Sequence, residues 1–310
     1  MPLWGFLLSF VAAALWAASP IMVNHGLSAS RCSTSDINPV RSAVFFISAF
    51  ATAYIATGGH IPVMTSAAAW FYIFVSVFIS YALGDILYFI AIREIGVSLA
   101  VPVANGYPIL VAFTSWFILG EEPTQKLLWG IVIVVAGLML LRFGGKDEKT
   151  EDIRRALHNK RRLMKGFSLA IAAGLMWALS SPLTKLAILT SGASAVNITF
   201  YRSVAFLIIT IAVRAAQRRY MPNQRPMPLR EIPLRAALYF AGASVIGLCA
   251  GSIIYAQCLA VLPVAIVTAI TATSPFIAAL YERIFKRVML TRLQWTGIAM
   301  TIVGSVIVGL

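Results

Sequence analysis

The sequence predicts an all-α polytopic membrane protein whose ten transmembrane helices form two inverted five-helix repeats. Of its 310 residues, 60% are hydrophobic and only 12% are charged, whereas a soluble domain carries about 25% charged residues. The apolar residues come in blocks of about 18 to 25, the length a helix needs to cross a hydrocarbon core of ~30 Å. The two halves of the chain also repeat one another, as shown below.

Ten apolar runs, bounded by glycine, proline and charged residues, mark the expected helices. Helices are expected throughout because lipid offers no hydrogen-bond partner to an open strand edge. They span residues 3–24, 39–57, 66–92, 97–119 and 125–143 in the first half, and 165–189, 194–213, 234–260, 263–285 and 292–309 in the second. The two long connections, 144–164 and 214–233, are polar and charged and are expected outside the bilayer.

The repeat appears as ordered pairs of matching residues at two offsets. The pairs are Trp16/Trp177 and Arg41/Arg202 at an offset of 161, then Gly84/Gly251, Tyr88/Tyr255, Pro108/Pro275, Gly130/Gly297 and Gly137/Gly304 at 167, with Pro20 and Pro182 matching across one inserted residue. Five helices is an odd number, so the second repeat enters the membrane from the opposite side, as in many secondary transporters. The predicted organisation is a first repeat at 1–143, a charged cytoplasmic linker at 144–164 and a second repeat at 165–310.

The net charge of +14 is explained by membrane topology. Of 25 Lys and Arg residues, 22 fall in or beside the odd-numbered connections. The positive-inside rule therefore places those connections in the cytoplasm and both termini outside. No nucleic-acid partner is needed to explain the basic excess, because solvated loops beside anionic lipid headgroups account for it.

Asp85 lies near the middle of the third predicted helix, where an ionisable side chain is costly unless it is paired or hydrated. Tyr81, Asp85 and Tyr88 share one helical face. This polar stripe could line a water-filled cavity and bind an ammonium group or carry a proton. The alternative is that neighbouring hydroxyls satisfy Asp85, which then only fixes helix packing.

Four prolines are expected to interrupt helices, since each removes a backbone hydrogen bond. Pro20 and Pro182 fall in the first and sixth helices, and Pro108 and Pro275 in the fourth and ninth. Symmetrically broken helices near the midplane indicate a transport site, although a kink can be purely architectural. Polar residues next to the breaks are further candidates for substrate binding: Asn105, Tyr107, Thr268 and Thr271.

Aromatic and cationic residues complete the candidate site. Trp16, Trp177, Tyr88, Tyr107 and Tyr255 could form a cage that stacks flat or cationic substrates, or could simply pack the core. The three cations Arg41, Lys185 and Arg202 could close the ends of a pathway or bind a carboxylate. Snorkelling to the interface is the alternative for the arginines, above all for Arg41.

Absent motifs narrow the function classes. The chain has no phosphate-binding GxxxxGKS/T loop and neither an HExxH pair nor a GxSxG elbow. The dispersed histidines and cysteines predict no metal site, and no cofactor is expected. A membrane-embedded enzyme acting on a lipid-linked substrate is the leading alternative to a transporter, but Asp85 alone is a thin catalytic constellation. A sensory receptor is disfavoured by the duplication and the lack of an output domain.

Over nearly its whole length the chain resembles the EamA type of the drug/metabolite transporter superfamily. The resemblance rests on the two five-helix repeats, the stretches Trp16-Ala-Ala-Ser-Pro20 and Trp177-Ala-Leu-Ser-Ser-Pro182, the paired arginines, Pro108, and Leu119-Gly120-Glu121-Glu122 leading to Gly130. One departure is that Val288-Met289 stand opposite Glu121-Glu122.

Within that superfamily the chain looks most like the YddG-type amino acid exporters. The resemblance implies efflux of aromatic and other neutral amino acids through a cavity lined by the third, fourth, eighth and ninth helices. The expected function is secondary transport that exports amino acids or similar small metabolites across the bacterial inner membrane by alternating access. The expected partners are a small-molecule substrate and the lipid bilayer, with no nucleic acid and no obligatory protein partner.

Overall fold

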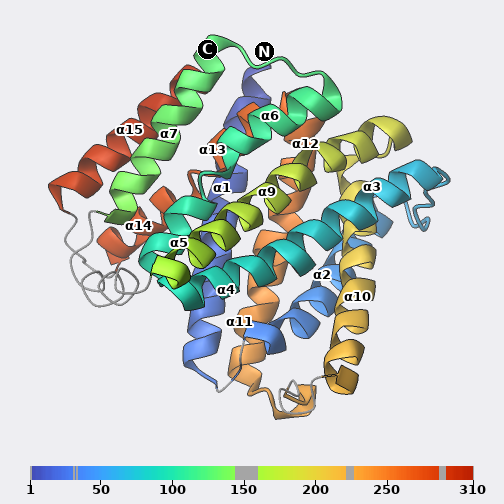
Figure 1. The fold of residues 1–310 in the computed structure, drawn as a ribbon. Helices are drawn as coiled ribbons and strands as arrows, with labels where there is room; N and C mark the ends of the chain where they lie inside the picture. Colours follow the sequence, from blue (N-terminus) through green and yellow to red (C-terminus); the bar gives the residue numbers. More distant parts are fainter. Residues whose placement is uncertain are drawn as a thin grey trace.

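The computed structural model describes residues 2–30, 32, 34–143, 160–220, 227–285 and 291–309, and all regular secondary structure in them is helical (Figure 1). The first half holds α1 (Leu3–Ser28), α2 (Thr34–Ala56), α3 (Ala67–Val77), η1 (Phe78–Gly84), α4 (Asp85–Ile95), α5 (Val97–Ala104), α6 (Tyr107–Leu119) and α7 (Gln125–Phe143). The second half holds α9 (Lys160–Ser191), α10 (Ala195–Tyr220), η3 (Leu229–Glu231), α11 (Leu234–Ala243), η4 (Ser244–Gly251), α12 (Ser252–Val261), α13 (Val264–Thr271), α14 (Ser274–Phe285) and α15 (Arg292–Gly309).

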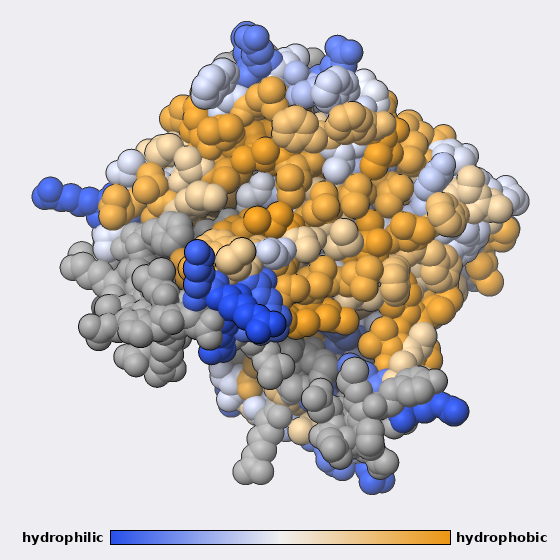
Figure 2. All heavy atoms as spheres, in the orientation of Figure 1, coloured by the Kyte–Doolittle hydropathy of each residue, from blue (hydrophilic) through white to orange (hydrophobic). Residues whose placement is uncertain are grey.

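The outer surface is that of a multi-pass membrane protein. Among the described residues, six helical stretches are long and apolar enough to cross a membrane, and three shorter apolar helices accompany them. Figure 2 shows hydrophobic residues across the middle of the visible face and hydrophilic residues at its upper and lower margins. Large apolar side chains such as Ile55 and Phe117 are almost fully exposed, at 78% and 79%. Such exposure is expected where lipid rather than water surrounds the helices.

The two halves run in opposite directions, as predicted. The chain begins and ends on the same face, at the top of Figure 1, whereas α9 begins at the opposite side. We call the first face, which carries both termini and residues 120–124 and 262–263, the terminal face. The opposite side, where α2 and α9 begin, is called the linker face.

Interruptions occur at equivalent places in the two halves. The third and eighth spans each contain a π-helical stretch, η1 and η4, that ends on a glycine: Gly84 and Gly251, 167 residues apart. The fourth and ninth spans each break in two, at residues 105–106 and 272–273. Pro108 and Pro275 lie in the first turn of the second pieces, where a missing N–H costs nothing. The predicted breaks of the fourth and ninth helices are therefore present.

The predicted breaks at Pro20 and Pro182 were wrong. Both prolines lie inside helices that continue through them, α1 and α9. For Pro182 the physical reason is visible. Its ring deprives the Ala178 carbonyl of its intrahelical donor, and the hydroxyl of Thr114 in α6 donates to that carbonyl at 3.0 Å. A donor from a neighbouring helix thus satisfies the carbonyl without a break.

Thr114→Val is expected to lower the free energy of unfolding by about 1 to 2 kcal/mol, the cost of leaving a buried carbonyl unsatisfied. The midpoint of thermal unfolding in detergent measures this loss. Thr190→Val is the matched control, because Thr190 is exposed and donates only within its own helix, to the Leu186 carbonyl at 2.7 Å. Equal midpoints for the two variants would contradict this account of Pro182.

Several helices extend further than their polar sequences predicted, among them α2, which begins at Thr34 instead of residue 39. The sixth span begins at Lys160 among the described residues, five residues before its predicted start, and α10 continues to Tyr220 instead of ending at residue 213. Charged residues were assigned to connections because they avoid lipid. Beyond the bilayer, however, backbone hydrogen bonding continues a helix with charged side chains on its surface. The rest of the predicted linker, residues 144–159, lies outside the described residues.

Glycine notches bring α7 and α15 into backbone contact. A Cβ added to Gly137 would lie 2.7 Å from both the Gly297 carbonyl oxygen and the Thr301 nitrogen. A Cβ on Gly304 would lie 2.7 Å from the Val134 nitrogen. These glycines therefore have the packing role that small residues have between membrane helices.

Candidate substrate-binding cavity

A central cavity of about 340 Å³ lies between the two halves. Both repeats contribute to its wall. Six residues predicted to bind substrate line it, Trp16, Tyr81, Asn105, Tyr107, Trp177 and Tyr255, together with Pro20, Arg41 and Arg202. The remaining lining residues are small, hydroxyl-bearing or apolar: Ser19, Ser80, Ser180, Ser181, Thr184, Gly247, Leu248, Ser252 and Ala256. The wall is therefore aromatic and polar, with two cations.

Aromatic residues pair across the boundary between the halves in a symmetric pattern. The Trp16 ring of α1 lies 4.9 Å from the Tyr255 ring of α12, and the Trp177 ring of α9 lies 5.1 Å from the Tyr88 ring of α4. These contacts are repeat equivalents. The glycines that end η1 and η4 make room for the indoles, because a Cβ on Gly84 would lie 2.8 Å from Trp177 Nε1 and one on Gly251 2.8 Å from Trp16 Nε1.

The two tryptophans donate to different groups. Trp16 Nε1 donates to the Gly247 carbonyl at 3.1 Å, whereas Trp177 Nε1 donates to Asp85 Oδ1 at 3.3 Å. Asp85 is the first residue of α4, and its repeat equivalent at the start of α12 is Ser252. Only the first half therefore places a carboxylate at this point.

A second cavity of about 260 Å³ adjoins the first, with Tyr81 lining both. Asp85 lines this second cavity and not the first. One wall is a stripe along α10 at helical spacing, made by Phe206, Ile209, Thr210, Val213, Arg214 and Gln217. Because this stripe ends three residues before the end of α10, the hollow extends from the centre toward the linker face.

The two arginines differ in their surroundings. Arg202 Nη1 donates to Ser76 Oγ at 3.2 Å and to Thr184 Oγ1 at 2.5 Å, and its guanidinium lies 6.0 Å from the centre of the Tyr81 ring. Arg41 also lines the central cavity, but its Nε is buried without a hydrogen-bond partner. The structure therefore does not support snorkelling of Arg41 to the interface.

On the terminal face, contacts of Lys185 and Glu121 join three segments over the cavity, and we call these contacts the Lys185–Glu121 tie. Lys185 Nζ donates to Glu121 Oε1 at 2.5 Å and to the Leu262 carbonyl at 2.8 Å. Glu121 Oε2 in turn accepts from the backbone nitrogen of Val264, at the start of α13, at 2.8 Å. Lys185 was predicted to act near this end of the molecule, but its partner Glu121 was not foreseen.

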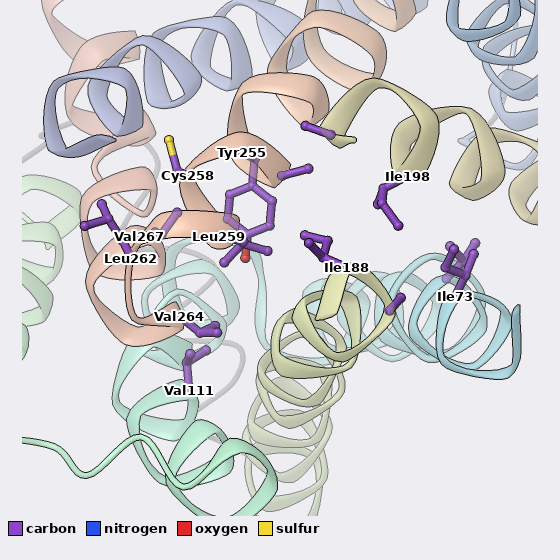
Figure 3. Close-up of a cluster of buried hydrophobic side chains, with 14 of the residues drawn as sticks. Ile73, Val111, Ile188, Ile198, Tyr255, Cys258, Leu259, Leu262, Val264 and Val267 are labelled. Atoms are coloured by element: carbon purple, nitrogen blue, oxygen red, sulfur yellow. The ribbon is translucent and has the colours of Figure 1, made fainter. Parts of the chain in front are cut away.

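Apolar packing reinforces this tie. Figure 3 shows Tyr255 beside Leu259, Leu262 beside Val267, and Val264 next to Val111 of α6. Leu259, Leu262, Val264 and Val111 are at most 1% exposed and belong to one buried cluster. Tyr255 belongs to the same cluster and also lines the cavity. The route from the cavity to the terminal face is thus filled.

Several residues predicted to bind substrate do not line the central cavity but pack behind the residues that do. Thr268 and Thr271 are 1% exposed, and Thr271 donates within its own helix to the Val267 carbonyl at 2.9 Å. Thr268 lies 3.5 Å from the Tyr255 hydroxyl, so Tyr255 stands between the ninth span and the cavity. Tyr88 packs on Trp177. Among the residues described as lining the central cavity none comes from the ninth span, which departs from the lining implied by the family resemblance.

Other cavity residues were missed by the sequence analysis. Five hydroxyl-bearing residues line the same space as the predicted aromatics: Ser19, Ser80, Ser180, Ser181 and Thr184. Tyr255 donates to Ser181 Oγ at 2.9 Å, so this hydroxyl also orients an aromatic wall residue. A signal was available, because Ser19 and Ser181 each directly precede one of the paired prolines.

Comparisons with known proteins agree with this architecture. A solved crystal structure matches 98% of this chain, and 96% of its own, with a TM-score of 0.73 and 15% identity, which supports the fold alone. An uncharacterized transporter from Archaeoglobus fulgidus is 24% identical over 284 residues, covering 91% of this chain and 89% of the relative. The model of the EamA-like transporter family matches residues 3–143 and 164–310. Since this match covers nearly the whole chain in two segments, the protein belongs to the EamA-like transporter family of the drug/metabolite transporter superfamily.

Proposed function

We propose that this protein is a secondary transporter that exports amino acids, aromatic and other neutral ones, or similar small metabolites across the bacterial inner membrane by alternating access. The observation that carries the proposal is the central cavity, whose wall combines paired aromatics, hydroxyl-bearing residues and two cations supplied by both inverted halves. Because the chain belongs to a transporter family, we set aside the alternative of an enzyme acting on a lipid-linked substrate.

The wall chemistry favours amphipathic substrates. Indole and phenol rings offer flat apolar surfaces, and the Trp16–Tyr255 and Trp177–Tyr107 pairs, at 4.9 and 6.0 Å, border the same space. Serine and threonine hydroxyls add hydrogen-bonding groups that adapt to several substrates. The resemblance of the sequence motifs to YddG-type exporters implies the same substrate class.

The charge distribution supports an orientation and a conformational state. If the linker face is cytoplasmic, as the positive-inside rule indicates, both termini are outside. The hollow that extends from Tyr81 to Gln217 then faces the cytoplasm, and the Lys185–Glu121 tie closes the outer side. This is the inward-facing state, from which an exporter loads its substrate.

Transport by purified protein in liposomes tests the proposal. We expect efflux of labelled Phe, Trp, Thr or Met down a gradient. Ser180→Trp should reduce the rate at least about tenfold, because the indole would fill a wall position of the cavity and exclude substrate. Thr190→Trp, at an exposed position of the same helix, should transport at the unmodified rate. No movement of any of the four amino acids through the unmodified protein would overturn the proposal.

A further inference from the structure

We infer that Arg41 and Asp85 form the two charged subsites for a zwitterionic α-amino acid, with Arg41 binding the carboxylate and Asp85 the ammonium group. The inference rests on the proposed function, because it assigns places within the cavities to the proposed substrate. It begins from the unequal surroundings of the two arginines.

Arg202 is anchored by three neighbours that the repeat does not provide to Arg41. The repeat equivalents of Ser76, Thr184 and Tyr81 are residues without hydrogen-bonding side chains: Ala243, Met22 and Leu248. Nη1 of Arg202 therefore has hydrogen-bond acceptors within the protein. At the positions equivalent to those three neighbours, the chain offers Arg41 only apolar side chains.

Within the described part of the chain, Arg41 takes part in no hydrogen bond or ion pair, and its Nε is buried. A guanidinium inside a membrane protein is costly when unpaired, and such residues mark substrate or ion sites. The planar fork of arginine fits a carboxylate through two parallel hydrogen bonds. Arg41 lines the cavity, so a ligand carboxylate can supply what the protein does not.

Asp85 provides the opposite charge on the other side of Tyr81. Arg41 lines the central cavity and Asp85 the second cavity, and Tyr81 belongs to both walls. Arg41 and Asp85 interact electrostatically, but no ion pair within 4 Å joins them among the described residues. A ligand carrying both a carboxylate and an ammonium group can therefore contact both without first breaking a bridge.

Trp177 fixes the carboxylate. Its Nε1 donates to Asp85 Oδ1 at 3.3 Å, and its ring lies on the wall of the central cavity. The indole therefore holds Asp85 at the boundary between the two cavities. The aromatic pairs Trp16–Tyr255 and Trp177–Tyr107 remain available for the substrate side chain.

Competition with three related compounds tests the two subsites on the unmodified protein. Phenylalanine carries both charged groups, phenethylamine lacks the carboxylate and 3-phenylpropionate lacks the ammonium group. Binding is followed by the fluorescence of the cavity tryptophans. We expect both analogues to bind at least about tenfold more weakly than phenylalanine, because each forfeits one charge-assisted hydrogen-bonded contact.

Variants then assign each charge to its residue. Arg41→Met should weaken binding of phenylalanine and phenylpropionate but not of phenethylamine, whereas Asp85→Asn should weaken phenylalanine and phenethylamine but not phenylpropionate. Arg41→Lys should restore part of the affinity. Lys126→Met, which removes an exposed cation on the terminal face, should change nothing.

The possible failures are distinct. Equal affinity for the three compounds, with phenylalanine still transported, would overturn the charged subsites and leave the proposed exporter standing. The same holds if Arg41→Met elutes and unfolds like the unmodified protein and binds phenylalanine unchanged. Absence of any amino acid transport by the unmodified protein would overturn both proposals together.

Discussion

Glu121→Gln is expected to open the terminal face. The Lys185 and Glu121 side chains are only 13% and 18% exposed, and removing one partner of such a largely enclosed ion pair costs up to about 3 kcal/mol. The substitution strips the Lys185 ammonium of its countercharge in the closed state alone. A shift of that size changes the ratio of open to closed forms by about a hundredfold.

Thiol labelling measures this shift. A cysteine placed at Ser181 on the cavity wall, in a background lacking Cys32, Cys249 and Cys258, should react with an impermeant maleimide applied from the terminal face. We expect faster labelling in Glu121→Gln. Glu122→Gln is the matched control, since Glu122 is the exposed neighbour in the same connection. Equal labelling rates in the two variants, both folded, would show that the tie does not hold this face closed.

Gly137→Val is expected to separate α7 from α15 and to abolish most folded protein. The added Cβ would approach the backbone of Gly297 and Thr301 to 2.7 Å. Backbone atoms in a packed helix cannot move aside as a flexible side chain can. We therefore expect a loss of at least about 3 kcal/mol, the upper range for overpacking.

The monodisperse fraction in size-exclusion chromatography and the midpoint of thermal unfolding measure this effect. Gly137→Ala should show a smaller loss in the same direction. Val132→Leu also enlarges a side chain of α7, but at a position that is 45% exposed, and it should behave like the unmodified protein. A normal yield and midpoint for Gly137→Val would contradict the assignment of this contact.

The sequence was sufficient for the architecture because that information is local and repeated. Runs of apolar residues fix the spans, and the matching offsets of Trp, Arg and Pro fix the inverted halves. The same local chemistry located the breaks before Pro108 and Pro275. The aromatic wall of the cavity was also predictable, since Trp16 and Trp177 each precede a proline by about one helical turn.

What could not be predicted depends on side chains from distant spans. Pro182 leaves α9 unbroken because Thr114, 68 residues earlier in the sequence, supplies a hydroxyl. Lys185 finds its countercharge in a connection of the other half. The different surroundings of Arg41 and Arg202 require three helices to be assembled before their partners can be compared.

Each half places a tryptophan ring against a glycine of the other half, so the packing of each repeat depends on the other. Gly84 leaves space for Trp177, and Gly251 leaves space for Trp16. An alanine at Gly84 would displace an indole that belongs to the opposite repeat, and that indole would withdraw its N–H from Asp85. A substitution in one repeat therefore disturbs the packing of the other. The two repeats can no longer diverge independently at these four positions.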